Sequence, residues 1–265
     1  MSSSSSEITV GYWGIRGLGA PLRMMVMFGG ASLKVENYDV AYNSDGGFDL
    51  SHWFGSKPAL KERNALMNLP YVIDGDFVVV QSNACMTYLG RKLGMAGENA
   101  QEASQIEQLL CEAYDIRNGI VGFAYGKGGA AGFSGYIAGT TSPNGSVGKL
   151  DLWLNRKCNC TVGASTFFVG SKAASADFAI FECLDQLRQM AAFYKEEDPL
   201  KNFPFLADFH EKFRALPNNA CYFASKLANL PCNNIQAASY GGTPSGAASM
   251  PDTDRSAWLS SSGTY

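Results

Sequence analysis

The sequence predicts an α/β domain followed by an all-helical domain. Strand-like and helical segments alternate through the first ninety or so residues in the order β-α-β-α-β-β-α. From Glu98 onward the helical periodicity continues, and no convincing strand follows. We therefore place an α/β domain at residues 1–94, a helical domain at 97–232 and an exposed low-complexity tail at 233–265.

Composition limits the partners that the chain can have. At 265 residues the chain can form two modest domains, each with its own core. A net charge of −3 provides no basic field for nucleic acid or an anionic membrane. No apolar run is long enough to span a bilayer. We expect neither a nucleic-acid partner nor a membrane span.

The cysteines and the first residues of the chain predict a cytoplasmic location. Seven cysteines without CxxC spacing, together with two histidines, argue against a metal site. Residues 1–6 are rich in serine but lack the apolar segment of a secretory signal. We therefore expect reduced thiols in the cytoplasm and no bound metal.

The first half of the α/β domain reads as strand, helix, strand. Ile8 to Trp13 is predicted as a strand that a glycine-rich turn follows. Pro21 suits the first turn of a helix through Phe28, which Gly29-Gly30 end. Leu33 to Val40 alternates apolar and polar residues, as a half-buried strand does.

A hairpin is predicted in the second half of this domain, after an irregular stretch. Two short apolar segments, residues 70–73 and 77–80, flank Asp74-Gly75, and an Asp-Gly pair in that position favours a tight turn. A proline before the first of these strands is typical of thioredoxin-like domains. We expect a cis bond at Leu69-Pro70, which leaves the backbone of Leu69 free to pair with a peptide as an added strand.

Gln81-Ser82 follows the hairpin and begins a helix that runs to about Leu93. Backbone amides at a helix N-terminus, together with a serine hydroxyl, can hold a carboxylate. On spacing alone, a plain helix cap is the favoured interpretation of Ser82. A peptide-like ligand with a free carboxylate at one end would fit both this site and Leu69.

The second domain shows helical periodicity in five segments: 103–125, 149–157, 177–194, 205–216 and 218–227. Residues 126–148 are rich in Gly, Ser and Thr and are predicted as a long loop, mobile or covered by a ligand. In the tail, Trp258 is either a stray exposed aromatic or a docking anchor.

The segment from Tyr12 to Leu18 (YWGIRGL) resembles the opening motif of mu-class glutathione transferases. Further matches follow in order, and the resemblance covers roughly residues 8–227: Trp53, Lys57, Asn68-Leu69-Pro70, Ile73-Asp74-Gly75, Gln81-Ser82-Asn83-Ala84, Asp115, Arg117, Tyr125, Phe168 to Lys172 and Asp177-Phe178. It implies the glutathione transferase fold, a thioredoxin-like glutathione-binding domain plus an all-α electrophile-binding domain.

The resemblance also implies roles for particular residues. Tyr12 would activate the thiol of glutathione, the co-substrate, for attack on a small apolar electrophile, as in detoxification. Glutathione itself would be held by Trp13, Trp53, Lys57, Asn68, Leu69, Gln81, Ser82 and Asp115 of the neighbouring subunit. Leu18, Arg117 and Tyr125 would face the electrophile, with Tyr125 as a second catalytic residue. The residues alone leave Tyr125 open as a core aromatic and Arg117 as a solvated helix charge.

Departures from the family pattern concern mainly the subunit contacts. Thr87 stands where the family has an arginine, and the aromatic key of the dimer is replaced by Leu66 or Met67. The N-cap of the core helix is Ala174 instead of Ser or Thr. We expect a homodimer weaker than that of mu-class enzymes. The alternative functions are a non-catalytic scaffold subunit of a larger assembly and a related glutathione-dependent isomerisation or peroxide reduction.

Overall fold

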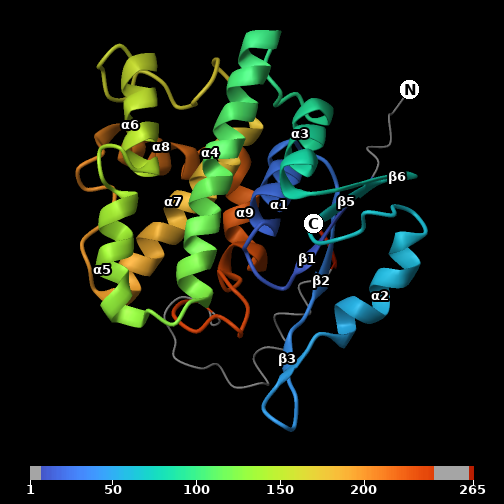
Figure 1. Cartoon of the computed structure of the whole chain (residues 1–265). Coiled ribbons are helices and arrows are strands. Elements are labelled where there is room, and N and C mark those ends of the chain that lie inside the picture. Colours follow the sequence, from blue (N-terminus) through green and yellow to red (C-terminus); the bar gives the residue numbers. More distant parts are fainter. Residues whose placement is uncertain (1–6, 242–262) are drawn as a thin grey trace, which may run out of the picture. The chain divides into compact units, whose positions relative to one another are not determined.

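The computed structural model describes residues 7–241 and 263–265 (Figure 1). The chain divides into two compact units. The N-terminal unit consists of Met1–Leu89, Cys221–Gln236 and Gly241–Tyr265. The helical unit consists of Gly90–Ala220 and Ala237–Tyr240. Within the described ranges, no helix is both long and apolar enough to cross a membrane.

The N-terminal unit contains a five-stranded sheet in the order β6-β5-β1-β2-β7. Strand β1 (Ile8–Trp13) pairs in parallel with β2 (Leu33–Tyr38) and antiparallel with β5 (Tyr71–Asp74). Helices α1 (Gly19–Phe28) and α3 (Ser82–Lys92) lie on one side of these strands, and α2 (Ser51–Lys61) lies on the other (Figure 1). This arrangement confirms the predicted thioredoxin-like fold.

The predicted hairpin is present. Strands β5 and β6 (Phe77–Val80) pair antiparallel, with Asp74 opposite Phe77. Gly75 in the turn has φ of +58°, a left-handed conformation that glycine adopts without a steric penalty. The Leu69–Pro70 bond is cis, as the sequence predicted.

The stretch between the second strand and the β5–β6 hairpin was predicted to be irregular, but it contains regular structure. It contains a small hairpin, β3 (Ala41–Tyr42) with β4 (Phe48–Asp49), and then helix α2. Only Trp53 of α2 is fully buried, so this helix has no apolar periodicity for the sequence to reveal.

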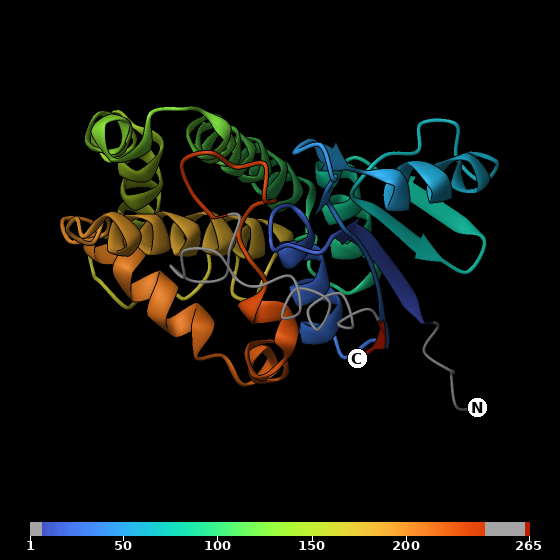
Figure 2. The same cartoon turned by 90° about the horizontal axis from the view of Figure 1, so that it is seen from below.

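The helical unit is built around α7 (Ser175–Tyr194), most of whose residues are buried. Figure 2 shows α7 between α4 (Ala100–Tyr125) and α8 (Pro204–Arg214), and both helices contact it. The last predicted helical segment is broken into short pieces: η1 (Pro217–Asn219), α9 (Ala220–Ala224) and η2 (Lys226–Asn229).

The prediction of a long loop at 126–148 was wrong. Residues Gly129–Thr140 form α5, and Ser146–Lys157 form α6. Phe133 of α5 is fully buried and stacks on Tyr194 with ring centroids 4.7 Å apart, while Tyr136 stacks on Phe123 at 5.0 Å. Burying these rings offsets the cost of about 1 kcal/mol for each glycine in a helix.

The prediction that the tail is exposed was wrong for part of it, while residues 263–265 are exposed as predicted. Asn233, Ser239 and Tyr240 are buried. At the end of the chain, Gly263–Thr264 form strand β7, which pairs antiparallel with the edge strand β2. Trp258 lies outside the described residues. The boundaries proposed at 94, 97 and 232 stay a prediction.

Candidate functional site

Tyr12 lies at the end of β1, directly beneath the turn that follows the strand. Its side chain is only 6% exposed, and a Cβ built on Gly17 would come 2.9 Å from its hydroxyl oxygen. A Cβ on Gly19 would come 2.8 Å from the ring. The two glycines are therefore required because the backbone of the turn passes directly over the tyrosine. Among the described residues, no hydrogen bond engages the Tyr12 hydroxyl, so it can donate to a ligand.

Arg23 of α1 fixes the chain around this tyrosine. Its fully buried guanidinium donates to the carbonyl oxygen of Ile15 at 2.7 Å and to that of Trp13 at 3.1 Å. It also donates to Oδ1 of Asn37 on β2, at 2.7 Å. These bonds join α1, β2 and the turn after Tyr12. Arg23 is not among the site residues predicted from the sequence, although an arginine on the buried face of an amphipathic helix is a signal that could have indicated it.

Trp53 and Lys57 come from successive turns of α2. The indole of Trp53 is buried against Tyr38 in an edge-on contact with centroids 4.9 Å apart, and it stacks at 6.4 Å on Tyr71. The ammonium group of Lys57 lies 5.5 Å from the Trp53 ring centroid. The aromatic neighbours hold the indole in one orientation, and the lysine places a positive charge above it.

A buried hydrogen-bond network lies beneath Trp53. The hydroxyls of Tyr38 and Tyr71 are 2.7 Å apart, and Tyr71 also donates to the carboxylate of Glu36. Burial raises the pKa of Tyr71 far above its ordinary value, and its bond to Glu36 acts in the same direction. Burial opposes ionisation of Glu36, but the bonds from Tyr71 and Lys34 outweigh it and lower the pKa of that carboxyl. Tyr71 therefore remains a neutral donor that supports the site.

Asn68 and Leu69 precede the cis-proline. Asn68 is exposed, whereas the side chain of Leu69 packs against the cluster formed by Trp53 and Tyr71. In the described chain, no hydrogen bond engages the backbone amide or carbonyl of Leu69. Both groups are available to a peptide that lies alongside as an added strand.

Gln81 and Ser82 form the junction between β6 and α3. Gln81 has φ of +74°, an unusual conformation for a residue with a side chain, and it turns the chain sharply into the helix. The first helical hydrogen bond runs from the amide of Cys85 to the carbonyl of Gln81 at 2.8 Å. The three amides before Cys85 are therefore available to an anion. Ser82 makes no side-chain bond to described residues, so nothing supports its reading as a helix cap.

The one cysteine of α3 is not a candidate nucleophile. Cys85 of α3 is buried, and burial raises the pKa of its thiol to about 12. A thiol with that pKa is almost wholly protonated at neutral pH and is a poor nucleophile. Among the described residues, no group of His, Cys, Asp and Glu could hold a metal ion.

The remaining predicted site residues are as follows. Leu18 is half-buried and is the N-cap of α1 in the N-terminal unit. Asp115 lies on α4 of the helical unit and is exposed. Tyr125 is the last residue of α4 and is half-buried. The segment that carries Ser239 packs there, since the amide of Ser239 donates to the carbonyl of Ala124 at 2.8 Å.

Arg117 is not a solvated charge, so that reading was wrong. Its side chain is 6% exposed, and it donates to Oε1 of Gln186 at 3.4 Å. Gln186 donates in turn to Glu182 at 2.6 Å. These residues connect α4 with α7 inside the helical unit, and contact of Arg117 with an electrophile stays a prediction.

Comparisons with known proteins show which family the chain resembles. Residues 8–91 match the family model described as glutathione S-transferase, N-terminal domain, and residues 150–226 match glutathione S-transferase, C-terminal domain. Glutathione S-transferase Mu 1 of Oryctolagus cuniculus is 32% identical over 84% of this chain and 94% of that protein. Glutathione S-transferase Mu 3 of Homo sapiens is 29% identical over 91% and 99%. A crystal structure of the glutathione S-transferase Blo t 8 has a TM-score of 0.71 at 25% identity, covering 87% of this chain and 98% of that one.

Proposed function

The chain belongs to the glutathione S-transferase family, and we propose that it conjugates glutathione to small apolar electrophiles with Tyr12 as the activating residue. The observation that carries the proposal is the position of the Tyr12 hydroxyl. It lies at the end of β1 under a glycine turn, and no described residue uses it. A hydroxyl that no described residue engages is available to donate to the sulfur of a bound ligand.

Glutathione is a tripeptide with a carboxylate at each end, and the N-terminal unit offers a group for each part. The free backbone of Leu69 suits the central cysteinyl residue. The free amides of α3 and the Ser82 hydroxyl suit the γ-glutamyl carboxylate, and Gln81 is exposed beside them. Trp53 and Lys57 suit the glycyl carboxylate. Trp13 and Asn68 complete the proposed contacts, and Asp115 would act from a neighbouring subunit.

The chemistry follows from the pKa of the thiol. A free thiol with a pKa of about 8.5 is only about 3% ionised at pH 7. A hydrogen bond from Tyr12 to the sulfur favours the thiolate, and lowering the pKa by about two units requires about 2.7 kcal/mol. The proton leaves to solvent, and the thiolate sulfur forms a bond to the electrophilic carbon. On an aryl halide, halide departs with the electron pair of the broken bond.

The resemblance to mu-class enzymes supports Leu18, Arg117 and Tyr125 as the proposed contacts of the electrophile. A hydroxyl such as that of Tyr125 can stabilise negative charge that develops on the electrophile or on its leaving group. We also propose that the enzyme acts in the cytoplasm as a homodimer.

Steady-state conjugation of an activated aryl chloride tests the proposal. Tyr12→Phe should lower kcat strongly and change glutathione affinity little, because the hydroxyl serves the thiolate and not the rest of the tripeptide. Tyr42→Phe is the matched control, since Tyr42 lies on β3 of the same unit and is 59% exposed. Glutathione binding by calorimetry without any conjugation by the unmodified protein would favour the scaffold function instead.

A further inference from the structure

The tail segment Ala237–Tyr240 belongs to the helical unit, and its Ser239 is hydrogen-bonded to the ends of three helices. Only 9% of Ser239 is exposed. Its amide donates to the carbonyl of Ala124, near the end of α4, at 2.8 Å. Its carbonyl accepts a hydrogen bond from the hydroxyl of Tyr194, the last residue of α7. The backbone of Ser239 therefore links the last turns of α4 and α7.

The hydroxyl of Ser239 bridges α4 and α5. It donates to the carbonyl of Gly126, the C-cap of α4, at 2.6 Å, and it accepts from the amide of Gly129, the first residue of α5, at 3.0 Å. The first amides and the last carbonyls of a helix have no partner within the helix itself. Gly128, the N-cap of α5, makes no side-chain cap. Ser239 thus supplies hydrogen bonds that the helix ends cannot form by themselves.

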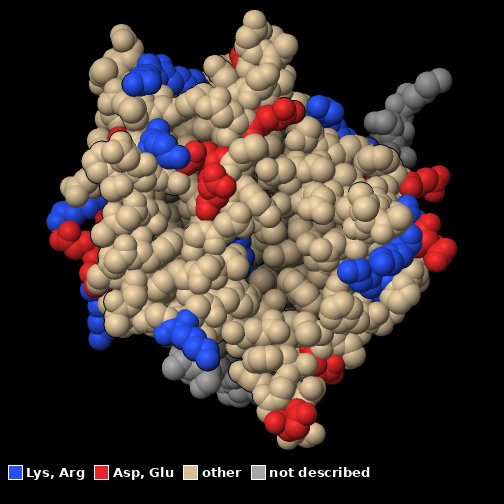
Figure 3. Space-filling model, viewed as in Figure 1, with Lys and Arg blue, Asp and Glu red and all other residues tan. Residues whose placement is uncertain are grey.

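Ion pairs cannot fix α5 to the end of α4, because the twelve residues of α5 include no charged side chain. Figure 3 shows mostly uncharged side chains where α5 lies beside the lower end of α4. Aromatic rings hold α5 against its neighbours, but packing of this kind depends only weakly on direction. Hydrogen bonds weaken steeply when the donor is misaligned. The bonds of Ser239 therefore determine where the last residues of α4 lie.

Tyr125 lies between the two residues of α4 whose carbonyls Ser239 engages. The amide of Ser239 holds the residue before it, Ala124, and the hydroxyl holds the residue after it, Gly126. Tyr125 is the last residue of α4, a position where helices commonly fray. With the carbonyls on both sides fixed, the backbone from which the Tyr125 side chain extends is fixed as well.

We propose, on the basis of the proposed function, that Ser239 is a positioning residue for Tyr125. The serine acts through the carbonyls of Ala124 and Gly126 and needs no contact with glutathione or the electrophile. Its effect should be largest for an electrophile that develops negative charge on a single oxygen. An epoxide does so: the thiolate sulfur bonds to carbon, the carbon–oxygen bond breaks, and the oxygen keeps the electron pair until it is protonated.

A double-mutant cycle tests this role, with styrene oxide as the electrophile and glutathione at saturation. Tyr125→Phe should lower kcat/KM for styrene oxide on the order of a hundredfold, as the loss of one donor to a developing oxyanion does. Ser239→Ala should lower it about tenfold, since a small displacement of a catalytic group costs less than its removal. The double variant should be no slower than Tyr125→Phe, because no hydroxyl is left to position.

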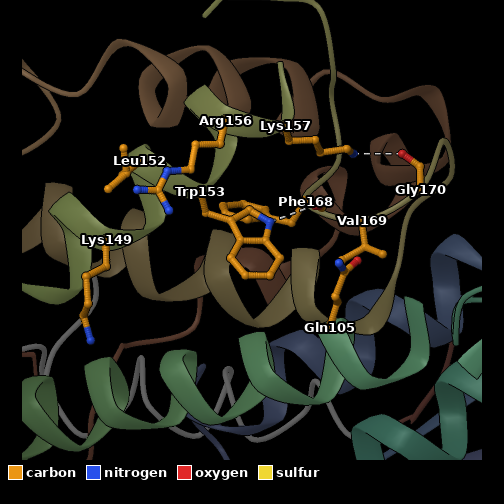
Figure 4. A pocket seen from close by; sticks show the side chains of 9 residues that line it. All are labelled: Gln105, Lys149, Leu152, Trp153, Arg156, Lys157, Phe168, Val169 and Gly170. Atoms are coloured by element: carbon orange, nitrogen blue, oxygen red, sulfur yellow. Dashed lines mark hydrogen bonds between the residues drawn. The ribbon is translucent and has the colours of Figure 1, made fainter. Parts of the chain in front are cut away.

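Two control variants remove comparable hydrogen bonds elsewhere. Ser225→Ala removes a hydroxyl of the N-terminal unit that, like that of Ser239, donates to one backbone group and accepts from another. Lys157→Met, at the end of α6, removes the ammonium group that fixes the segment before α7 by donating to the carbonyl of Gly170 at 2.8 Å (Figure 4). Both variants should keep the kcat/KM of the unmodified protein for styrene oxide.

The role of Ser239 is overturned if Ser239→Ala keeps the kcat/KM of the unmodified protein, or if its loss multiplies with that of Tyr125→Phe. If Ser239→Ala does not fold, Tyr194→Phe replaces it in the cycle, because it removes the donor to the Ser239 carbonyl, and the same pattern is expected. A Tyr125→Phe variant with full rate overturns the roles of both residues. Failure of the unmodified protein to conjugate either styrene oxide or the aryl chloride would instead refute the proposed function.

Discussion

Gly17→Ala tests whether the placement of the Tyr12 hydroxyl governs turnover. The added Cβ would lie 2.7 Å from Cε1 and 2.9 Å from the hydroxyl oxygen of Tyr12. Carbon atoms in ordinary contact are about 3.5–4.0 Å apart. The tyrosine ring or the turn must therefore move by roughly 1 Å. No chemical group that touches the ligand is removed.

Two separate effects follow from this change. Displacing a catalytic group by about 1 Å can cost on the order of a hundredfold in rate, so we expect kcat to fall by about ten- to a hundredfold. Gly17 also has φ of +40°, where alanine costs about 1–2 kcal/mol, so the free energy of unfolding should fall as well.

Gly30→Ala separates the two effects. Gly30 has φ of +70°, and a Cβ built there meets nothing within 4 Å. It should lose a similar unfolding free energy in urea while keeping its kcat for the aryl chloride. If Gly17→Ala retains the kcat of the unmodified enzyme, or if Gly30→Ala loses as much rate, the reasoning about Tyr12 is wrong.

Three further predictions concern other parts of the chain. Ser82→Ala should clearly weaken glutathione binding in calorimetry, whereas the control Ser104→Ala, in the first turns of α4, should not. Equal glutathione affinities of Ser82→Ala and the unmodified protein would refute the proposed carboxylate site. Leu66 is 72% exposed and Met67 is 2% exposed, so we expect Leu66 to be the residue that inserts into the partner subunit of the proposed dimer. Sedimentation should show a reversible dimer. Leu66→Ala should raise the dissociation constant of this dimer by about ten- to a hundredfold, corresponding to about 1–3 kcal/mol. A monomer at every concentration of the unmodified protein would contradict this prediction. Ala174 is the N-cap of α7, and its side chain makes no capping hydrogen bond. Ala174→Ser should therefore raise the free energy of unfolding, measured in urea, by about 1 kcal/mol. An unchanged free energy of unfolding would show that a serine at this position does not cap the helix.

The elements that the sequence predicted well are those that local chemistry determines. Asp74-Gly75 specified the hairpin turn, and Gly29-Gly30 ended α1, with Gly29 as its C-cap. The Leu69-Pro70 pair indicated the cis bond. In each case the decisive residues are neighbours in the chain, so a single window of sequence contains the whole signal.

The elements that the sequence predicted poorly depend on distant partners. Helix α5 is rich in glycine, and it is stabilised by rings of α4 and α7 that no local window includes. Strand β7 is two residues long. It forms by hydrogen bonding to the backbone groups along the edge of β2 that no other strand pairs with.

Within the proposed site, the residues expected to contact glutathione could be proposed by resemblance, but the residues that hold them in place could not. Arg23 and the Tyr38–Tyr71–Glu36 network act through contacts that join residues far apart in the sequence. The family motif names Tyr12 and Trp53 without showing what holds them in place.

The ionisation of glutathione bound to the protein tests the central claim most directly. The thiolate absorbs in the ultraviolet, so its absorbance can be titrated against pH in the unmodified protein and in Tyr12→Phe. Since a hydrogen bond from Tyr12 favours the thiolate, the pKa of the bound thiol should lie below that of free glutathione in the unmodified protein and should rise in the variant. Superimposable titration curves for the two proteins would contradict the role assigned to Tyr12.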